Sequence, residues 1–254
     1  ATATRTPTAP ATATPTRTPT RTPTAPATAT PTRTRTRTLT ATTLATANRA
    51  LSFDGANDDA RGPQIPNPAS FTIEAWVRPS TSGQDGMIVV ASDDFDGWSL
   101  ELEDGLATLW FGRRGVWTLV SNSEVTLEAG RWYHVAATYS GGAVRVFVNG
   151  RPGAAVALAA PGQGPWFRLG GFSGYPFFAG AIDEVRLSSG ARYSAAFTPP
   201  SAPFTPDAST VALYHLDEGA GQSAADSAGS YGLTLGASIG ADSADPIWTG
   251  GAIP

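Results

Sequence analysis

The sequence contains neither cysteine nor lysine, and the lack of cysteine excludes several kinds of chemistry. The chain can form no disulfide bond, and it has no thiol nucleophile and no thiolate metal site. It has no run of about 18 apolar residues, so we expect no membrane insertion. No Asn-x-Ser/Thr sequence occurs, so any glycan would be O-linked. The net charge of -4 argues against nucleic acid as a partner.

Basic residues are few and unevenly placed. All 17 are arginine, and seven of them fall within the first 49 residues, where there is no acidic residue. The rest of the chain is therefore strongly acidic. Because exposed ion pairs contribute only about 0 to 1 kcal/mol each, attraction between the first segment of one subunit and the body of another would orient contacts rather than hold them.

Residues 1–47 consist almost wholly of Thr, Ala, Pro and Arg, with Thr at every even position from 2 to 42 except 10 and 26. The block at residues 9–12 recurs at 25–28, so this segment contains an internal repeat. Its prolines forbid a helix, and no large apolar residue precedes Leu39, so it cannot form a core. We expect an extended, non-globular Thr/Pro-rich stalk about 150 Å long.

Two interpretations of this stalk stay open. Its composition is typical of a flexible spacer. Alternatively, it is a thread that O-linked sugars stiffen or that lies against neighbouring subunits in a fibre. The candidate O-glycosylation sites are Thr12, Thr14, Thr16, Thr18, Thr20, Thr22, Thr24, Thr28, Thr30, Thr32, Thr34 and Thr36.

A different pattern begins at Leu51, where short alternating runs are separated by Gly, Pro and Asp clusters. Residues 72–78, 98–103 and 143–148 alternate in this way, so each run can bury one face in an all-β sandwich. The same alternation predicts that Trp76 and Trp132 point inward. Asn149 and Gly150 follow the last run and predict a type I′ hairpin turn, because both central residues of that turn need a positive φ.

Four motifs in this region resemble laminin-G-like, concanavalin-A-like domains. They are ALSFDGAND (50–58), FTIEAWV (71–77), RWYHVAATY with VFVNG (131–139 and 146–150) and GAIDEVRL (180–187). The resemblance implies a two-sheet jelly-roll sandwich of the kind used for adhesion and often for carbohydrate binding. We expect the stalk at residues 1–47, the sandwich at 48–200 and a C-terminal extension at 201–254.

A fifth motif is out of its usual order. The sequence VALYHLDEGAG (211–221) resembles the strand that usually begins such domains, but here it comes last. It either completes its own sandwich or is donated to the next subunit. Intramolecular closure is favoured, because a short linker gives a high effective concentration. Donation would build a head-to-tail filament of copies of this chain, since a heterologous contact that does not close propagates.

The acidic residues and histidines give little support for catalysis. Glu101 and Glu103 are two residues apart on one run, and we interpret them as a solvated face opposite Trp98, Leu100 and Leu102. The Glu-x-Asp-x-x-Glu signature of related laminarinases is missing. The only two histidines lie in strand-like segments without a serine motif beside them, so Ser/His/Asp catalysis is unsupported. We expect no enzyme.

Calcium is the cofactor that the oxygen-rich loops suggest. Asp54, Asn57 and Asp58 share one loop, and the resemblance places Asp183 near it, which would cluster the oxygens that calcium prefers. The alternative, that Asp54 and its neighbours serve only as turn residues, stays open.

Exposed aromatic residues are the candidates for sugar stacking. Trp110, Trp117 and Trp166 are such candidates, and the loop-like segment at 170–178 is the best single one, with Phe172, Tyr175, Phe177 and Phe178 as contact residues for carbohydrate or another subunit. Our leading hypothesis is an extracellular or cell-surface structural protein assembled into a fibre or matrix. The alternatives are a monomeric carbohydrate-binding adhesin and a non-catalytic module of a larger glycosidase.

Overall fold

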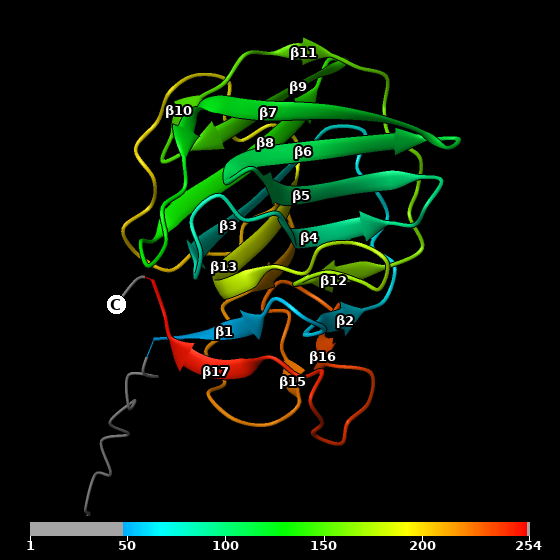
Figure 1. The fold of residues 1–254 in the computed structure, drawn as a ribbon. Coiled ribbons are helices and arrows are strands. Elements are labelled where there is room, and N and C mark those ends of the chain that lie inside the picture. Colours follow the sequence, from blue (N-terminus) through cyan, green and yellow to red (C-terminus); the bar gives the residue numbers. More distant parts are fainter. Residues whose placement is uncertain (1–47, 253–254) are drawn as a thin grey trace, which may run out of the picture. The chain divides into compact units, whose positions relative to one another are not determined.

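A computed structural model describes residues 48–252, and every regular element in that range is a β-strand (Figure 1). The strands form two antiparallel sheets of nine and eight strands. The all-β, two-sheet sandwich predicted from the alternation and the resemblance is confirmed. The stalk at 1–47, with its candidate O-glycosylation threonines, lies outside the described residues. Within the described range, no helix is long and apolar enough to span a bilayer.

The nine-stranded sheet has the order β10-β9-β8-β3-β13-β1-β17, with β11 paired to β9 and β14 paired to β13. Its strands are β1 (Arg49–Asp54), β3 (Phe71–Pro79), β8 (Tyr133–Ser140), β9 (Ala143–Val148), β10 (Arg151–Pro152), β11 (Val156–Ala157), β13 (Ala179–Ser189), β14 (Thr210–Tyr214) and β17 (Ile247–Gly250). One edge of β13 pairs along its length with β3, and its other edge is shared end to end by β1 and β14.

The eight-stranded sheet has the order β15-β16-β2-β12-β4-β5-β6-β7. Its strands are β2 (Ala60–Gly62), β4 (Gly86–Ser92), β5 (Gly97–Glu103), β6 (Leu106–Arg113), β7 (Val116–Thr126), β12 (Phe167–Leu169), β15 (Ser223–Ala224) and β16 (Leu233–Leu235). In Figure 1, β4 to β7 follow one another across this sheet, which makes them a broad, continuous platform.

Aromatic side chains join the two sheets in the core. Phe71 on β3 stacks on Trp98 of β5, with ring centroids 5.3 Å apart. Phe167 on β12 stacks on Tyr214 of β14 at 5.8 Å. All four side chains are buried, and burying a side chain of this size contributes about 1.5 to 3 kcal/mol. These contacts fix the face-to-face packing of the sandwich.

The outer face of the nine-stranded sheet carries a buried polar network instead of open solvent. Glu74 on β3 accepts hydrogen bonds from the Arg186 Nε–H (2.8 Å) and the Tyr193 hydroxyl (2.7 Å). His134 Nε2 lies 3.0 Å from the same carboxylate, and both side chains are fully buried. The chain after β13, which supplies Tyr193, is thus tied to the sheet.

This covered outer face explains why the predicted inward direction of Trp76 is wrong. The inward positions of β3 are those of Phe71, Ile73, Ala75 and Val77, so Trp76 faces outward with Glu74, and its ring contacts His134 edge-on at 5.5 Å. Trp132 also lies outside the core, with the Arg78 guanidinium 5.0 Å from its ring centroid.

The hairpin between β9 and β10 has the turn that the sequence predicts. Asn149 and Gly150 adopt φ values of +48° and +75°, as a type I′ turn requires. The Asn149 side-chain oxygen also accepts a hydrogen bond from the backbone of His134 (2.9 Å). The turn therefore fixes the end of the neighbouring strand β8.

Residues 210–254 supply strands to both sheets. Within this single chain, β14 pairs with β13 and β17 pairs with β1, while β15 and β16 extend the other sheet next to β2. Tyr214, Leu216 and Leu233 from this segment belong to the core. The motif that is displaced in the sequence thus lies in the sandwich of its own chain in this structure.

Candidate functional site

The outward face of β5 forms the floor of a groove. Trp98, Leu100 and Leu102 point into the core, so the alternate residues Ser99, Glu101 and Glu103 point to the outer surface of the sheet. The predicted division of β5 into an apolar and an acidic face is confirmed. Glu101 is nevertheless only 6% exposed, so the interpretation of this face as solvated is wrong for that residue.

Two tryptophans from β6 and β7 form one wall of the groove. Trp110 donates its indole N–H to Glu103 Oε1 at 2.7 Å, which fixes both side chains. Trp117 is paired across the hairpin with Gly112, and its ring lies directly against that glycine. A side chain at position 112 would occupy the space of the Trp117 ring, so the glycine makes this orientation possible.

The loop between β12 and β13 supplies the facing wall. Phe172 and Tyr175 contact each other with ring centroids 4.7 Å apart. The Tyr175 hydroxyl donates a 2.8 Å hydrogen bond to Asp94 Oδ1, and this bond raises the pKa of the phenol. The loop is attached to the sheet by the Met87 N–H, which donates to the carbonyl of Pro176 at 3.1 Å.

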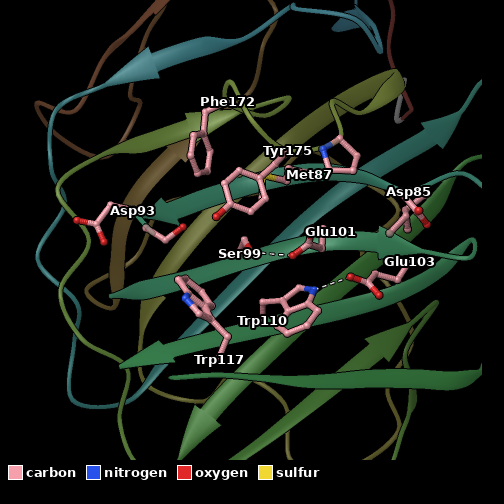
Figure 2. A pocket seen from close by; sticks show the side chains of 13 residues that line it. Asp85, Met87, Asp93, Ser99, Glu101, Glu103, Trp110, Trp117, Phe172 and Tyr175 are labelled. Carbon is pink, nitrogen blue, oxygen red and sulfur yellow. Dashed lines mark hydrogen bonds between the residues drawn. The ribbon is translucent and has the colours of Figure 1, made fainter. Parts of the chain in front are cut away.

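Together these residues enclose a groove of about 240 Å³. In Figure 2, Phe172 and Tyr175 face Trp110 and Trp117, with Glu101 between the two pairs. The lining residues are Asp85, Met87, Ser92, Asp93, Ser99, Glu101, Leu102, Glu103, Trp110, Trp117, Phe172, Tyr175 and Pro176. Aromatic walls with a few polar groups are typical of small-ligand sites.

The electrostatics of the floor are set by the burial of Glu101. Burial raises the pKa of this carboxyl to about 8, with smaller contributions from the negative charges of Glu103 and Asp85. The hydrogen bond that the Ser99 hydroxyl donates to Glu101 Oε1 (2.8 Å) acts in the opposite direction. Near neutral pH, Glu101 can therefore exchange a proton with its surroundings.

Only some of the predicted contact residues line the groove. Phe172 and Tyr175 line the groove. Phe177 is only half-buried but does not line it, and its backbone forms a bridge with Met87. Phe178 is fully buried in the core, so it is no surface contact. Of the tryptophan candidates, Trp110 and Trp117 line the groove, while Trp166 is 50% exposed outside it.

The predicted calcium residues are only partly brought together. Asp54 accepts hydrogen bonds from the N–H groups of Ala56 and Asn57, and Asp58 accepts one from the Asp54 N–H at 2.8 Å. Asp54 pairs with the first residue of β13, whereas Asp183 lies four residues, or roughly 13 Å, further along that strand. The structure therefore separates Asp183 from the loop.

Asp183 has a different partner, because its Oδ2 accepts a hydrogen bond from the Ala252 N–H at 2.7 Å. Burial raises the pKa of Asp183 to about 7 and that of Asp58 to about 6. Between residues 48 and 252, no group of three or more His, Cys, Asp or Glu side chains is placed to hold a metal ion. Calcium at these residues stays a prediction.

The sequence pattern did not indicate that four carboxylates, Asp85, Asp93, Glu101 and Glu103, line one groove. Asp85 lies just before β4 and Asp93 just after it, in the turn that leads to β5. Only the pairing of β4, β5 and β6 brings them beside Glu101 and Glu103. The alternation of β5 did signal the outward pair, but the burial of Glu101 depends on a loop more than 60 residues later.

Comparisons with known proteins agree with this architecture. A family model described as the concanavalin A-like lectin/glucanases superfamily matches residues 53–196, more than half of the chain. The chain belongs to this superfamily. A comparison with curated proteins found no match to this chain.

Solved structures similar to this superfamily member include a protein from Bacteroides ovatus ATCC 8483 described as a "putative carbohydrate binding protein". The TM-score is 0.56 at 23% identity over 79% of this chain and 61% of that one, and this likeness shows the fold. Domain 4 of an extracellular GH43 arabinanase from Geobacillus stearothermophilus, in complex with arabinotriose, has a TM-score of 0.48 and 26% identity. The match covers 56% of this chain and 71% of that one. Domains LG4-5 of the mouse laminin α1 chain have a TM-score of 0.47 and 21% identity, and the match covers 58% of this chain and 45% of that one.

Proposed function

We propose that this chain is a carbohydrate-binding module and that the groove over β4 to β7 is its binding surface. The observation that carries the proposal is the meeting of four aromatic side chains, Trp110, Trp117, Phe172 and Tyr175, around one acidic floor. Aromatic faces pack against the apolar faces of sugar rings, and carboxyl oxygens accept hydrogen bonds from sugar hydroxyls.

Binding without hydrolysis is the form of this proposal that the sequence favours. Glycoside hydrolysis uses two carboxyl groups that flank the scissile bond. The Glu-x-Asp-x-x-Glu signature, which carries the carboxylates of related laminarinases on one strand, is missing from this sequence, although Glu101 and Glu103 are alternate residues of β5. Chromatography of oligosaccharides after prolonged incubation with the protein tests this point, because shortened products would contradict it.

A titration of neutral, cationic and anionic oligosaccharides, followed by calorimetry and tryptophan fluorescence, tests the proposed binding surface. We expect Trp117→Ala to weaken binding at least tenfold, because it removes one of the two tryptophans that form one wall of the groove. The matched control is Trp166→Ala, which removes a tryptophan that is half exposed outside the groove. If both variants bind as the original protein does, or if no oligosaccharide binds at all, the proposed function is wrong.

We further propose that the module acts outside the cell as an adhesive subunit of a surface fibre. This proposal is supported by the basic Thr/Pro stalk and by the opposite charge of the remaining chain. Electron microscopy and the intact mass of the purified protein test it. Filaments, with added mass located on residues 1–47, are expected. An unmodified monomer that retains an oligosaccharide would leave only the carbohydrate-binding module.

A further inference from the structure

The groove is lined by acids and by no base. Asp85, Asp93, Glu101 and Glu103 lie in its walls and floor, while arginine and histidine are absent from the lining formed by the described residues. Since the chain contains no lysine, no lysine from elsewhere in it could add positive charge there. The groove is therefore a site of concentrated negative charge between aromatic walls.

One arginine lies near the groove without lining it. The Arg168 guanidinium lies 6.0 Å from the centroid of the Phe172 ring, but it also forms an ion pair with the buried Asp59 at 3.1 Å. Arg168 does not line the groove, and its guanidinium also lies 5.6 Å from the centroid of the Trp166 ring.

The carboxyl groups are held in place by bonds that use one oxygen each. Glu103 Oε1 accepts the Trp110 indole N–H, and Glu101 Oε1 accepts the Ser99 hydroxyl. Asp85 Oδ1 accepts the backbone N–H of Asp104 at 2.7 Å. In the described part of the chain, no hydrogen bond uses the second oxygen of Asp85 or Glu103, so these two oxygens remain as fixed acceptors for a ligand.

We infer that the groove selects amino sugars with a free ammonium group over neutral sugars and rejects sugars that carry carboxylate or sulfate groups. This inference rests on the proposed function and names its ligand class. An ammonium group donates three hydrogen bonds and carries the charge that the fixed carboxyl oxygens attract, whereas an anion would meet repulsion from every side of the floor. Burial keeps Glu101 protonated near pH 6, because it raises the pKa of this carboxyl to about 8, so the attraction comes from the carboxylates of Asp85, Asp93 and Glu103.

Three tetrasaccharides with the same β-1,4-linked gluco backbone test the inference, namely those of glucose, glucosamine and glucuronic acid. They are titrated near pH 6, where the amine is charged, in low salt. We expect the glucosamine tetramer to bind at least tenfold more tightly than the glucose tetramer and the glucuronic acid tetramer not to bind. The preference should shrink in about 0.5 M salt, which screens the attraction.

Variants connect the preference to the groove. Glu103→Gln keeps an acceptor oxygen for Trp110 but removes the charge, so it should reduce the glucosamine-to-glucose preference several-fold. The matched control is Glu218→Gln, on an exposed carboxylate outside the groove lining, which should leave the preference unchanged.

The outcomes separate the inference from the proposed function. If the glucose or glucuronic acid tetramer binds as tightly as the glucosamine tetramer, the inferred selectivity is wrong and carbohydrate binding stands. The same conclusion holds if only an unrelated neutral oligosaccharide binds. If no saccharide binds, both the inference and the proposed function are wrong.

Discussion

At the scale of single residues, the balance between burial and hydrogen bonding determines the chemistry of the groove floor. Glu101 is almost fully buried, and one hydroxyl hydrogen bond from Ser99 does not offset the loss of water around a charged carboxylate. Its pKa of about 8 places the change from neutral to charged close to physiological pH. The same residue thus links the stability of the fold to pH.

Glu101→Gln should change how stability depends on pH. The folded pKa of about 8 lies above the ordinary value of 4.5, so between these values the folded state retains a proton that the unfolded state has lost. The contribution of Glu101 to the free energy of unfolding is therefore fully present below pH 4.5 and is lost as the pH rises toward 8. The variant is neutral at every pH. Its free energy of unfolding should equal that of the original protein near pH 4.5 and be larger by on the order of a few kcal/mol at pH 9. Urea unfolding at both pH values measures this, and parallel pH profiles would contradict it.

Gly112→Ala should weaken carbohydrate binding without touching the ligand. An added Cβ would lie 2.6 Å from the Trp117 ring, so the indole must move out of the groove wall. We expect a loss of affinity of at least fivefold and a changed tryptophan emission spectrum. The control is Gly250→Ala, a strand glycine with no atom within 4 Å of the added Cβ. Unchanged affinity in Gly112→Ala would show that the orientation of Trp117 does not matter for binding.

The candidate site was only partly predictable from residue types. The aromatic loop was recognisable because Gly, Pro, Phe and Tyr cluster there, and Phe172 and Tyr175 do line the groove. The same clustering could not separate them from Phe178, because the direction of a loop residue depends on where the loop attaches. The loop attaches through the hydrogen bond that the Met87 N–H donates to the Pro176 carbonyl, and no local sequence pattern predicts this bond.

At the scale of elements, alternation predicted where the strands lie. It predicted which side chains point to the core only for strands whose outer face is not covered by another part of the chain. β5 follows the rule, with its acids outward. β3 has seven fully or nearly fully buried residues among nine, because a later chain segment covers its outer face. The inward direction predicted for Trp76 is therefore wrong, since apolar character alone does not distinguish the core from a covered outer face.

The hairpin turn at Gly150 should tolerate no side chain. An alanine Cβ there would lie 1.8 Å from the carbonyl oxygen of Phe197, in addition to the strain of a positive φ. Gly83 has a similar φ of +70° but open space, so Gly83→Ala incurs only the strain of about 1 to 2 kcal/mol. We expect Gly150→Ala to be about 1 to 3 kcal/mol less stable than Gly83→Ala in urea unfolding. Equal losses would show that residues near Phe197 move away freely from the hairpin.

At the scale of the whole molecule, the sandwich extends beyond the region that the family model covers. The match ends at residue 196, yet four later strands join both sheets. Two of them pair with β13 and β1 in the nine-stranded sheet, and the other two extend the sheet that bears the groove. The sequence indicated this role through the displaced strand motif, but it left open which copy of the chain receives the segment.

Removal of residues 210–254 tests whether the segment is required by its own chain. Truncation exposes the edges of β13 and β1 and removes Tyr214, which stacks on Phe167, from the core. The truncated chain should therefore lose cooperative urea unfolding and the near-ultraviolet circular dichroism of packed aromatic residues. Adding the 210–254 segment as a separate peptide should restore both signals at high peptide concentration, since the contacts are the same and only the effective concentration differs. A truncated chain that unfolds cooperatively as a monomer, but no longer assembles, would instead show that the segment serves a neighbouring copy.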